Sequence, residues 1–450
     1  MVSTADARLA GSSPSLGFDF GTTNSVIARP DAHGDVRPVP FSDDASGFAS
    51  FRSVLCFWEE NGALRPEINA AAGPAAIRHF IENVGDCRFL QSLKSFAASE
   101  LFQSTRIYGR AYGFADLLET FTALLFAAAI PPLTDMPNRA VLGRPVRFAG
   151  AKPNGALALA RYRQALTPFG VPDVRFVYEP VAAAFFFARR LDAAANVLVA
   201  DFGGGTSDFS IMRFEPRDGI IHPRAIAWSG VGVAGDTFDY RIVDHVVAPA
   251  LGKGSLYREW GTAVAMPQRF YTTLARWNEL SIMKATRSYG ELKALLTMSD
   301  EPHKLEAFVQ LIEDDQGYPL YQAVSAAKER LSREEQTDFR FALGNSTLET
   351  TIARSDFERW IAPDLARLGG AVDTVLARAA MSSNQIDRVF LTGGSSFVPA
   401  VRALFAQRFG AARIETGDEL VSIAHGLAMI GERDDIDLWC VTGREESTAQ

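Results

Sequence analysis

The sequence is poor in cysteine and has no long hydrophobic run. Its 450 residues include three cysteines, Cys56, Cys87 and Cys440. An odd number at wide spacing predicts buried free thiols in a reducing compartment and argues against a disulfide framework. The longest apolar runs, at 124–130 and 181–188, fall far short of the roughly 20 residues that span a bilayer. We therefore expect no membrane segment.

A basic cluster and a secretion signal are also missing. The net charge is −8, with 45 basic against 53 acidic residues, and no basic patch stands out, which argues against nucleic acid as a partner. The opening residues, MVSTADARLAGSSPSLG, lack the apolar core of a secretion signal. We expect a soluble, cytoplasmic protein with neither a nucleic-acid nor a membrane partner.

The composition that remains is that of a globular protein. Hydrophobic residues make up 47% of the chain and charged residues 22%, which is an ordinary balance for a soluble fold. A chain of this length can bury large cores and form two domains or lobes. Because no low-complexity linker divides the chain, we expect the lobes to interleave along the sequence.

The most informative motif is VLVADFGGGTSDFSIM, at 197–212. An apolar run ends at Asp201, three glycines follow, and alternation resumes after Thr206 and Asp208, which predicts a strand, a glycine turn and a second strand. Glycine lets successive backbone N–H groups converge on an anion. A carboxylate beside such a turn suits a phosphate that arrives with Mg²⁺ and its waters. The alternative is a plain hairpin turn.

A shorter copy of this motif lies near the start of the chain, in LGFDFGTTNSVIARP at 16–30. Asp19 ends an apolar segment, and Gly21 and Thr22 open the turn, as Asp201 and its glycines do later. The match is short enough to arise by chance, but both copies occupy a strand–turn–strand junction. Two similar half-structures facing one ligand explain the repeat. Each half would give a turn to the phosphates and an aspartate to the metal.

Two isolated charged residues have both a structural and a functional interpretation. Glu179 precedes Pro180 at the predicted start of a helix, so it either caps the positive helix end or serves a site near Asp201. Lys94 stands alone among apolar residues in CRFLQSLKSF, where a lysine is usually a surface residue with a buried stem.

Glycine-containing turns recur in the second half of the chain. In VFLTGGSSFVP, a strand is followed by Gly393, Gly394 and a helix start, which predicts either an anion or nucleotide edge or a simple loop. Glycines 230, 232 and 235 match GxGxxG, but no βαβ unit surrounds them, so we interpret them as a turn before a helix. We also predict helices over 66–80 and 319–331.

Taken in order, these motifs resemble the ATPase domain of the seventy-kilodalton heat-shock (DnaK-like) chaperones, within the actin-like and sugar-kinase superfamily. The resemblance covers about residues 16 to 431, and the residues of the motifs favour the chaperone branch over the sugar kinases. It implies an α/β, actin-like ATPase (ribonuclease H-like) duplicated fold with two lobes around a central nucleotide cleft. The motifs that carry it are GFDFGTTNS, YEPVAAAF, DFGGGTSDFS, GDTFDYRIVDH, TGGSSFVP and SIAHGLA.

The resemblance implies ATP and Mg²⁺ as ligands and assigns roles by motif. Asp19 and Asp201 would hold Mg²⁺ through its waters, and Lys94 would approach the γ-phosphate. Glu179, Asp208 and Thr206 would help to position metal, phosphate and attacking water, as phosphoryl transfer requires. The phosphates would contact Gly21, Thr22, Thr23, Asn24, Gly203, Gly204, Gly205 and Thr206. Ribose and adenine would be bordered by Gly235, Lys328, Gly393, Gly394 and Ser395.

Some positions depart from the family pattern. Ser325 and Glu329 stand where the family has a glutamate and an arginine around the adenine, and Phe397 replaces a further arginine, which leaves base specificity open. The sequence ends about 20 residues after the last shared motif, where the chaperones continue into a peptide-binding domain, so we expect no such domain here. Clients and co-chaperones are left open. Alternatives to an ATPase are a nucleotide-binding scaffold with little hydrolysis and a small-molecule kinase.

The predicted domain organisation follows the resemblance. We expect a flexible tail at 1–15, lobe I at 16–195 and lobe II at 196–392, with a mostly helical subdomain at 252–330. The adenosine motif and closing helices would cover 393–431, and a short tail 432–450.

Overall fold

The structure is a computed structural model of the whole chain. It describes residues 15–42, 49–61, 66–83, 86–146, 148, 152–188, 193–217, 220–274, 280, 283, 287–314, 316–343, 346–415 and 421–441. The predicted tails at 1–15 and 432–450 therefore lie partly outside the described residues. The chain forms two compact units. The first unit comprises Met1–Gly232, Ala371–Ser396 and Phe405–Gln450, and the second Val233–Gly370 and Phe397–Leu404.

The first sheet of the first unit is built around strand β1. Its strand order is β11-β10-β1-β2-β3, with β4 paired to β2. Strand β1 pairs antiparallel with β2 and parallel with β10, and β10 pairs parallel with β11. The strands are β1 (Leu16–Phe20), β2 (Asn24–Pro30), β3 (Val36–Pro38), β4 (Phe51–Arg52), β10 (Arg139–Arg144) and β11 (Asp173–Tyr178).

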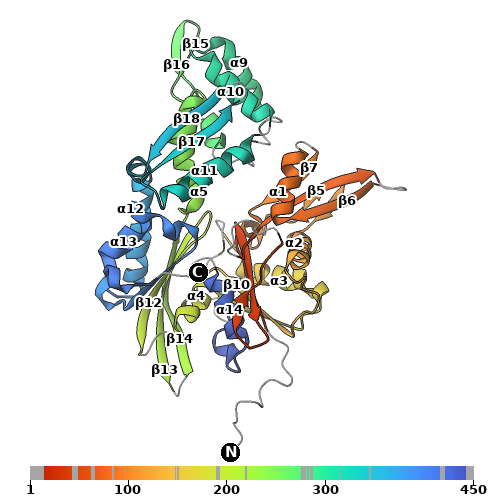
Figure 1. Cartoon of the computed structure of the whole chain (residues 1–450), viewed down its shortest axis with the longest axis vertical. Helices are drawn as coiled ribbons and strands as arrows, with labels where there is room; N and C mark the ends of the chain where they lie inside the picture. Colours follow the sequence, from red (N-terminus) through yellow and green to blue (C-terminus); the bar gives the residue numbers. More distant parts are fainter. Residues whose placement is uncertain are drawn as a thin grey trace, which may run out of the picture. The chain divides into compact units, whose positions relative to one another are not determined.

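The second sheet of this unit repeats the same topology around strand β12. Its order is β14-β13-β12-β19-β20, with antiparallel neighbours on one side of β12 and parallel neighbours on the other. The strands are β12 (Ala195–Phe202), β13 (Ser207–Arg217), β14 (Ile220–Val231), β19 (Arg388–Thr392) and β20 (Ile414–Glu415). The predicted duplicated α/β fold is confirmed (Figure 1).

Two helices, α4 (Glu179–Ala188) and α14 (Ser422–Gly431), pack against each other and contact these sheets. Helix α14 lies on β1 and α4 on β12. A Cβ atom added to Gly426 would lie 1.8 Å from the carbonyl oxygen of Ala182, and one added to Gly17 would lie 2.3 Å from that of Ala424. Glycine at both positions therefore allows helix–helix and helix–sheet contact at backbone distance.

The first unit also contains a three-stranded sheet with the strand order β6-β5-β7. The predicted helix over 66–80 is wrong in its first half, because β6 (Pro66–Ala72) pairs with β5 (Val54–Asn61) and only α1 (Gly73–Glu82) is helical. Cross-strand pairing overrides the helix preference of alanine here. The other elements are β7 (Cys87–Gln91), η1 (Leu93–Phe96), β8 (Thr105–Ile107), β9 (Arg110–Tyr112), α2 (Phe114–Ala128), α3 (Gly155–Leu166), η2 (Thr167–Phe169), η5 (Ser383–Gln385), η6 (Gly394–Phe397), η7 (Ala411–Arg413) and η8 (Ile436–Leu438).

The second unit combines helices with two hairpins. Helix α11 (Gly317–Leu331), close to the predicted 319–331, packs on α5 (Gly235–Ile242) and on strand β17 (Gln336–Leu343). The stretch 252–330 also contains the hairpin β15–β16. The remaining elements are η3 (Val243–Val247), α6 (Ala248–Ala250), β15 (Leu256–Glu259), β16 (Thr262–Ala265), α7 (Arg269–Leu274), α9 (Arg287–Leu295), η4 (Leu296–Met298), α10 (Pro302–Glu313) and β18 (Ser346–Ala353), with α12 (Arg354–Arg378) and α13 (Pro399–Phe409) shared between the units.

None of the described helices is long and apolar enough to cross a membrane.

Candidate functional site

The two aspartates predicted to face one ligand lie at equivalent ends of the two related sheets. Asp19 is next to last in β1, and Asp201 is next to last in β12. Asp201 pairs directly with Asp208 across the β12–β13 ladder, and the amide of Gly203 donates to the carbonyl of Thr206, 2.9 Å away. The predicted strand, turn and strand are confirmed, and they bring two carboxylates to one point.

Lys94 and Glu179 form a buried ion pair beside these aspartates. The Nζ atom of Lys94 lies 2.7 Å from Oε1 of Glu179, and the two side chains are only 10% and 7% exposed. The lysine comes from η1 and the glutamate is the first residue of α4. The interpretation of Lys94 as a surface residue is wrong. Glu179 does more than begin a helix, because its carboxylate meets a cation from another element.

The three aspartates of this cluster have raised pKa values. Burial and the charge of Glu179 raise the pKa of Asp19 to about 7 and that of Asp208 to about 7, although Lys94 opposes both shifts. Burial, followed by the charges of Glu179, Asp19 and Asp208, raises the pKa of Asp201 well above its usual value. Four carboxyl groups therefore share one lysine, an excess of negative charge that favours a bound cation.

The donor set fits a metal held through water. Among the described residues, no three His, Cys, Asp or Glu side chains are grouped so that they could hold a metal ion. Mg²⁺ usually keeps several of its waters and takes only one or two carboxylates. Asp19 and Asp201 therefore suit Mg²⁺ that retains its waters and also contacts phosphate. The buried hydroxyl of Tyr162, which has no partner in the described part of the chain, is a further polar group near Lys94 and Asp19.

Glycines shape the site because side chains would collide there. A Cβ on Gly143 would lie 3.0 Å from Cγ of Glu179, and one on Gly230 would lie 2.7 Å from Oδ1 of Asp208. Gly393 has a φ of +82°, and its Cβ would lie 2.1 Å from the carbonyl oxygen of Phe202. Gly393 thus lies directly beside the turn that follows Asp201.

The turn between β1 and β2 is held from outside by the next part of the chain. The amide of Ser53 donates to the carbonyl of Thr23 at 2.9 Å, and Nη1 of Arg52 donates to Oδ1 of Asn24 at 3.3 Å. A Cβ on Gly21 would lie 2.0 Å from the carbonyl oxygen of Asn24. Residues 21–24 are half-buried. In the other turn, Gly203, Gly205 and Thr206 are exposed and Gly204 is half-buried.

The residues predicted to border the base are divided between the units. Gly393, Gly394 and Ser395 belong to the first unit. In the second unit, Nζ of Lys328 lies 2.8 Å from Oδ2 of Asp239 and 3.3 Å from the carbonyl oxygen of Gly235. Helix α5 begins at Gly235, as the turn-before-helix interpretation predicts. Ser325 is half-buried, and Glu329 is exposed.

Sequence reasoning missed the residue that supports the Lys94 segment. Arg161 on α3 donates to the carbonyls of Phe96, Ala97, Ser99 and Phe102 at 3.1, 2.9, 3.0 and 2.7 Å. These carbonyls follow Lys94 closely in the chain, so one guanidinium holds the loop that carries it. The helix contains two arginines, Arg161 and Arg163, and nothing in the sequence distinguishes Arg161 from an arginine at a surface position.

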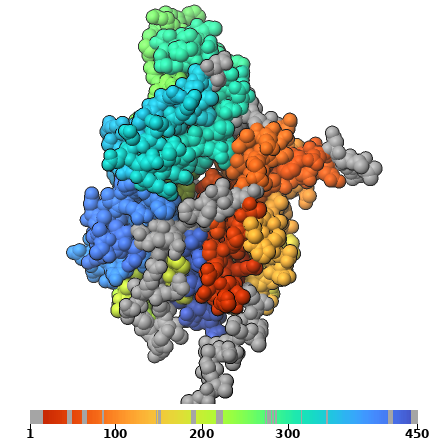
Figure 2. All heavy atoms as spheres, viewed as in Figure 1, coloured from red at the N-terminus to blue at the C-terminus, as the bar shows by residue number. Residues whose placement is uncertain are grey.

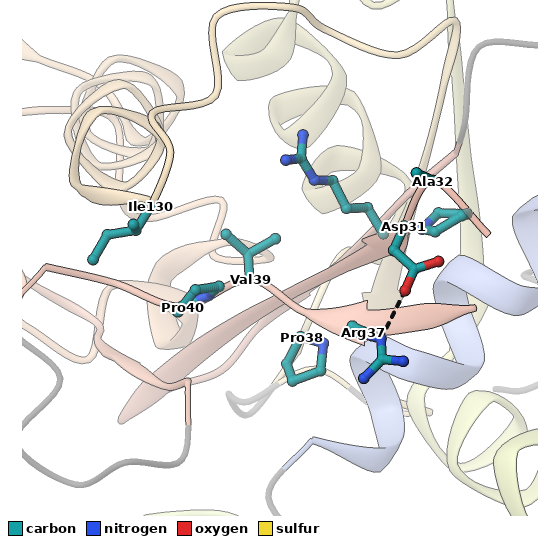
Figure 3. A pocket seen from close by; sticks show the side chains of 9 residues that line it. Asp31, Ala32, Arg37, Pro38, Val39, Pro40 and Ile130 are labelled. Carbon is teal, nitrogen blue, oxygen red and sulfur yellow. Dashed lines mark hydrogen bonds and ion pairs between the residues drawn. The ribbon is translucent and has the colours of Figure 1, made fainter. Parts of the chain in front are cut away.

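A separate cavity of about 310 Å³ lies elsewhere in the first unit (Figure 3). Its walls come from the hairpin of β2 and β3 and from Ile130, and Arg37 and Asp31 form a 2.8 Å ion pair at its edge. Strand β2 begins at Asn24, next to the turn of the site, and ends at Pro30. The cavity is therefore at the opposite end of β2 from the carboxylate cluster.

Comparison with known proteins identifies the family. The model of the family described as Hsp70 protein matches residues 162–256 and 301–433, just over half of the chain. The matched ranges include Glu179, Asp201, Asp208, Lys328 and Gly393. Membership supports a nucleotide-binding, chaperone-like ATPase module with the actin-like fold. The chain belongs to the Hsp70 family.

Proposed function

We propose that this protein binds ATP with Mg²⁺ and hydrolyses it at the carboxylate cluster of the first unit. The observation that carries the proposal is the arrangement of Asp19 and Asp201 at equivalent ends of two related sheets, beside the Lys94–Glu179 pair. A cluster with surplus carboxylates and one lysine suits a polyphosphate that arrives with its metal. Bare phosphate would be repelled.

Each residue of the cluster has a distinct task in this proposal. Asp19 and Asp201 hold the waters of Mg²⁺, which would neutralise charge on the phosphates when bound. Glu179 keeps the ammonium of Lys94 in place, and that ammonium faces the γ-phosphate. Asp208, 3.4 Å from the Thr206 hydroxyl, orients the attacking water. Positioning and charge stabilisation of this kind supply most of the catalysis in phosphoryl transfer.

Backbone groups of two turns contact the phosphates in this proposal. These turns contribute Gly21, Thr22, Thr23, Asn24, Gly203, Gly204, Gly205 and Thr206. Ribose and adenine are bordered in this proposal by Gly235, Lys328, Gly393, Gly394 and Ser395. The boundaries of lobe I at 16–195, lobe II at 196–392 and the closing segment at 393–431 are part of the same proposal, as is a cytoplasmic location.

Steady-state hydrolysis and calorimetry test this function together. We expect ATP binding that is much weaker without Mg²⁺, and phosphate release that requires no added sugar or polyol. Binding without release above background would replace the ATPase with the scaffold alternative. Release that depends on an added polyol would identify a kinase. Titrations with ADP and GTP measure the base preference that Ser325, Glu329 and Phe397 leave open.

A further inference from the structure

Two of the three cysteines meet on one face of the β6-β5-β7 sheet. In the antiparallel ladder of β5 and β7, Cys56 pairs with Phe89 and Trp58 pairs with Cys87. Cys56 and Cys87 are therefore diagonal neighbours with side chains on the same face. The neighbouring thiols shift each other's pKa values through hydrogen bonding. This sheet belongs to the segment coloured orange in Figure 2.

The two thiols have different environments. Cys56 is fully buried, whereas Cys87 is half-buried and reachable from solvent. The hydrogen bond from Cys56 lowers the pKa of Cys87, although burial and Asp86 oppose this. The same bond and burial raise the pKa of Cys56. The accessible thiol is thus the better nucleophile, and the buried thiol of its diagonal neighbour stays protonated.

We propose that Cys56 and Cys87 form a peroxide-reactive dithiol that closes to an intramolecular disulfide. The Cys87 thiolate attacks one oxygen of hydrogen peroxide, the O–O bond breaks, and the departing hydroxide takes a proton to become water. The resulting sulfenic acid, Cys87–SOH, is then attacked by the sulfur of Cys56. An S–S bond forms, the S–O bond breaks, and the hydroxyl leaves as water with the Cys56 proton. Peroxide is reduced and the two thiols are oxidised.

Closure moves strands that lead directly into the candidate site. Diagonal neighbours in an antiparallel pair are about 7–8 Å apart at Cα, and a disulfide needs about 4.4–6.8 Å, so β5 and β7 must shift along each other. Strand β7 ends at Gln91, just before the segment of Lys94. Strand β5 follows Ser53, whose amide holds the carbonyl of Thr23. Oxidation therefore displaces the lysine segment and one turn of the site.

Mass spectrometry of the full chain tests the dithiol. After reduction, removal of reductant and brief treatment with hydrogen peroxide, non-reducing peptide maps should show a Cys56–Cys87 link that dithiothreitol reverses. The C440S variant should behave like the wild type. In C56S, Cys87 should remain a sulfenic acid that dimedone traps, and C87S should give neither product. Oxidation of wild-type Cys87 to sulfinic acid as readily as in C56S, or faster reaction of Cys440, would overturn the proposal.

The effect on the site rests on the proposed ATP function and is measured separately. Calorimetry should show ATP affinity reduced about fivefold in the oxidised wild type, within the usual range of coupling between sites, and unchanged in peroxide-treated C56S. An unchanged affinity in the oxidised wild type would exclude the coupling. If the reduced protein bound no ATP, the proposed function would fail, while the peptide maps would still decide on the dithiol.

Discussion

Asp201 lies directly opposite Asp208 in the ladder of β12 and β13, with a four-residue glycine turn between them in the chain. Two carboxylates in direct cross-strand register repel each other, and the nearby charges of Asp19 and Glu179 add to the repulsion. An arrangement that costs stability in this way is typical of a site that is completed by a cation.

Replacing Asp201 with asparagine should reduce ATP hydrolysis by about 100-fold or more, because one of the two carboxylates for the Mg²⁺ waters is lost. Phosphate release under saturating Mg²⁺ measures the change. The matched control is D135N, an exposed aspartate of the same unit, which should retain the wild-type rate. A fully active D201N would contradict the assignment of the site.

The metal-free protein should lose stability as the pH rises from about 4 to about 7. Asp19 and Asp208 have folded-state pKa values of about 7, above the ordinary value, so the folded state binds more protons than the unfolded state in this range. Their ionisation at higher pH therefore disfavours folding. Denaturant unfolding of wild type and D208N across this range should show a shallower decline in the variant.

Mg²⁺ should oppose this loss of stability. Because it requires ionised carboxylates, its stabilising effect should grow as the pH passes through about 7. Identical pH profiles with and without Mg²⁺ would argue against a cation at this cluster.

Breaking the Lys94–Glu179 pair from one side should destabilise the fold. The variant K94M leaves a buried carboxylate without its partner, for which we expect a loss of about 3 kcal/mol in the free energy of unfolding. The double variant K94M/E179Q removes both charges and should recover most of that stability without recovering hydrolysis. Denaturant unfolding and phosphate release report the two effects separately. If the double variant regained activity, the pair would be structural only.

A methyl group at Gly143 should disturb the site with little effect on stability elsewhere. The added Cβ would lie 3.0 Å from Cγ of Glu179, so G143A should shift the glutamate and lower kcat by roughly tenfold, less than the roughly 100-fold that a misplacement of about 1 Å can cost. The control is G290A on α9, where an added Cβ would meet no heavy atom of the described residues within 4 Å. If G143A were as active as the wild type, the Glu179 side chain would tolerate the added methyl group without loss of activity.

The sequence by itself predicted the elements whose residue pattern specifies both a strand and the turn that ends it. The strands that contain Asp19 and Asp201, and the glycine turns that follow them, could be predicted from the sequence alone, because strand period and turn chemistry are local properties. The duplication followed from the same pattern occurring twice. The order of motifs was enough to predict the family that the comparison shows.

Only the tertiary structure decided which isolated residues meet. Lys94 and Glu179 are far apart in sequence, and neither has a local pattern that distinguishes a buried partner from a surface residue or a helix cap. The strand over Pro66–Ala72 has an alanine-rich, helix-favouring sequence, and its pairing with β5 is a non-local contact. The hydrogen bonds of Arg161 and the diagonal placement of Cys56 and Cys87 depend in the same way on elements that the fold brings together. Local propensity contains no information about such partners, because their free energy comes from burial and pairing with distant segments.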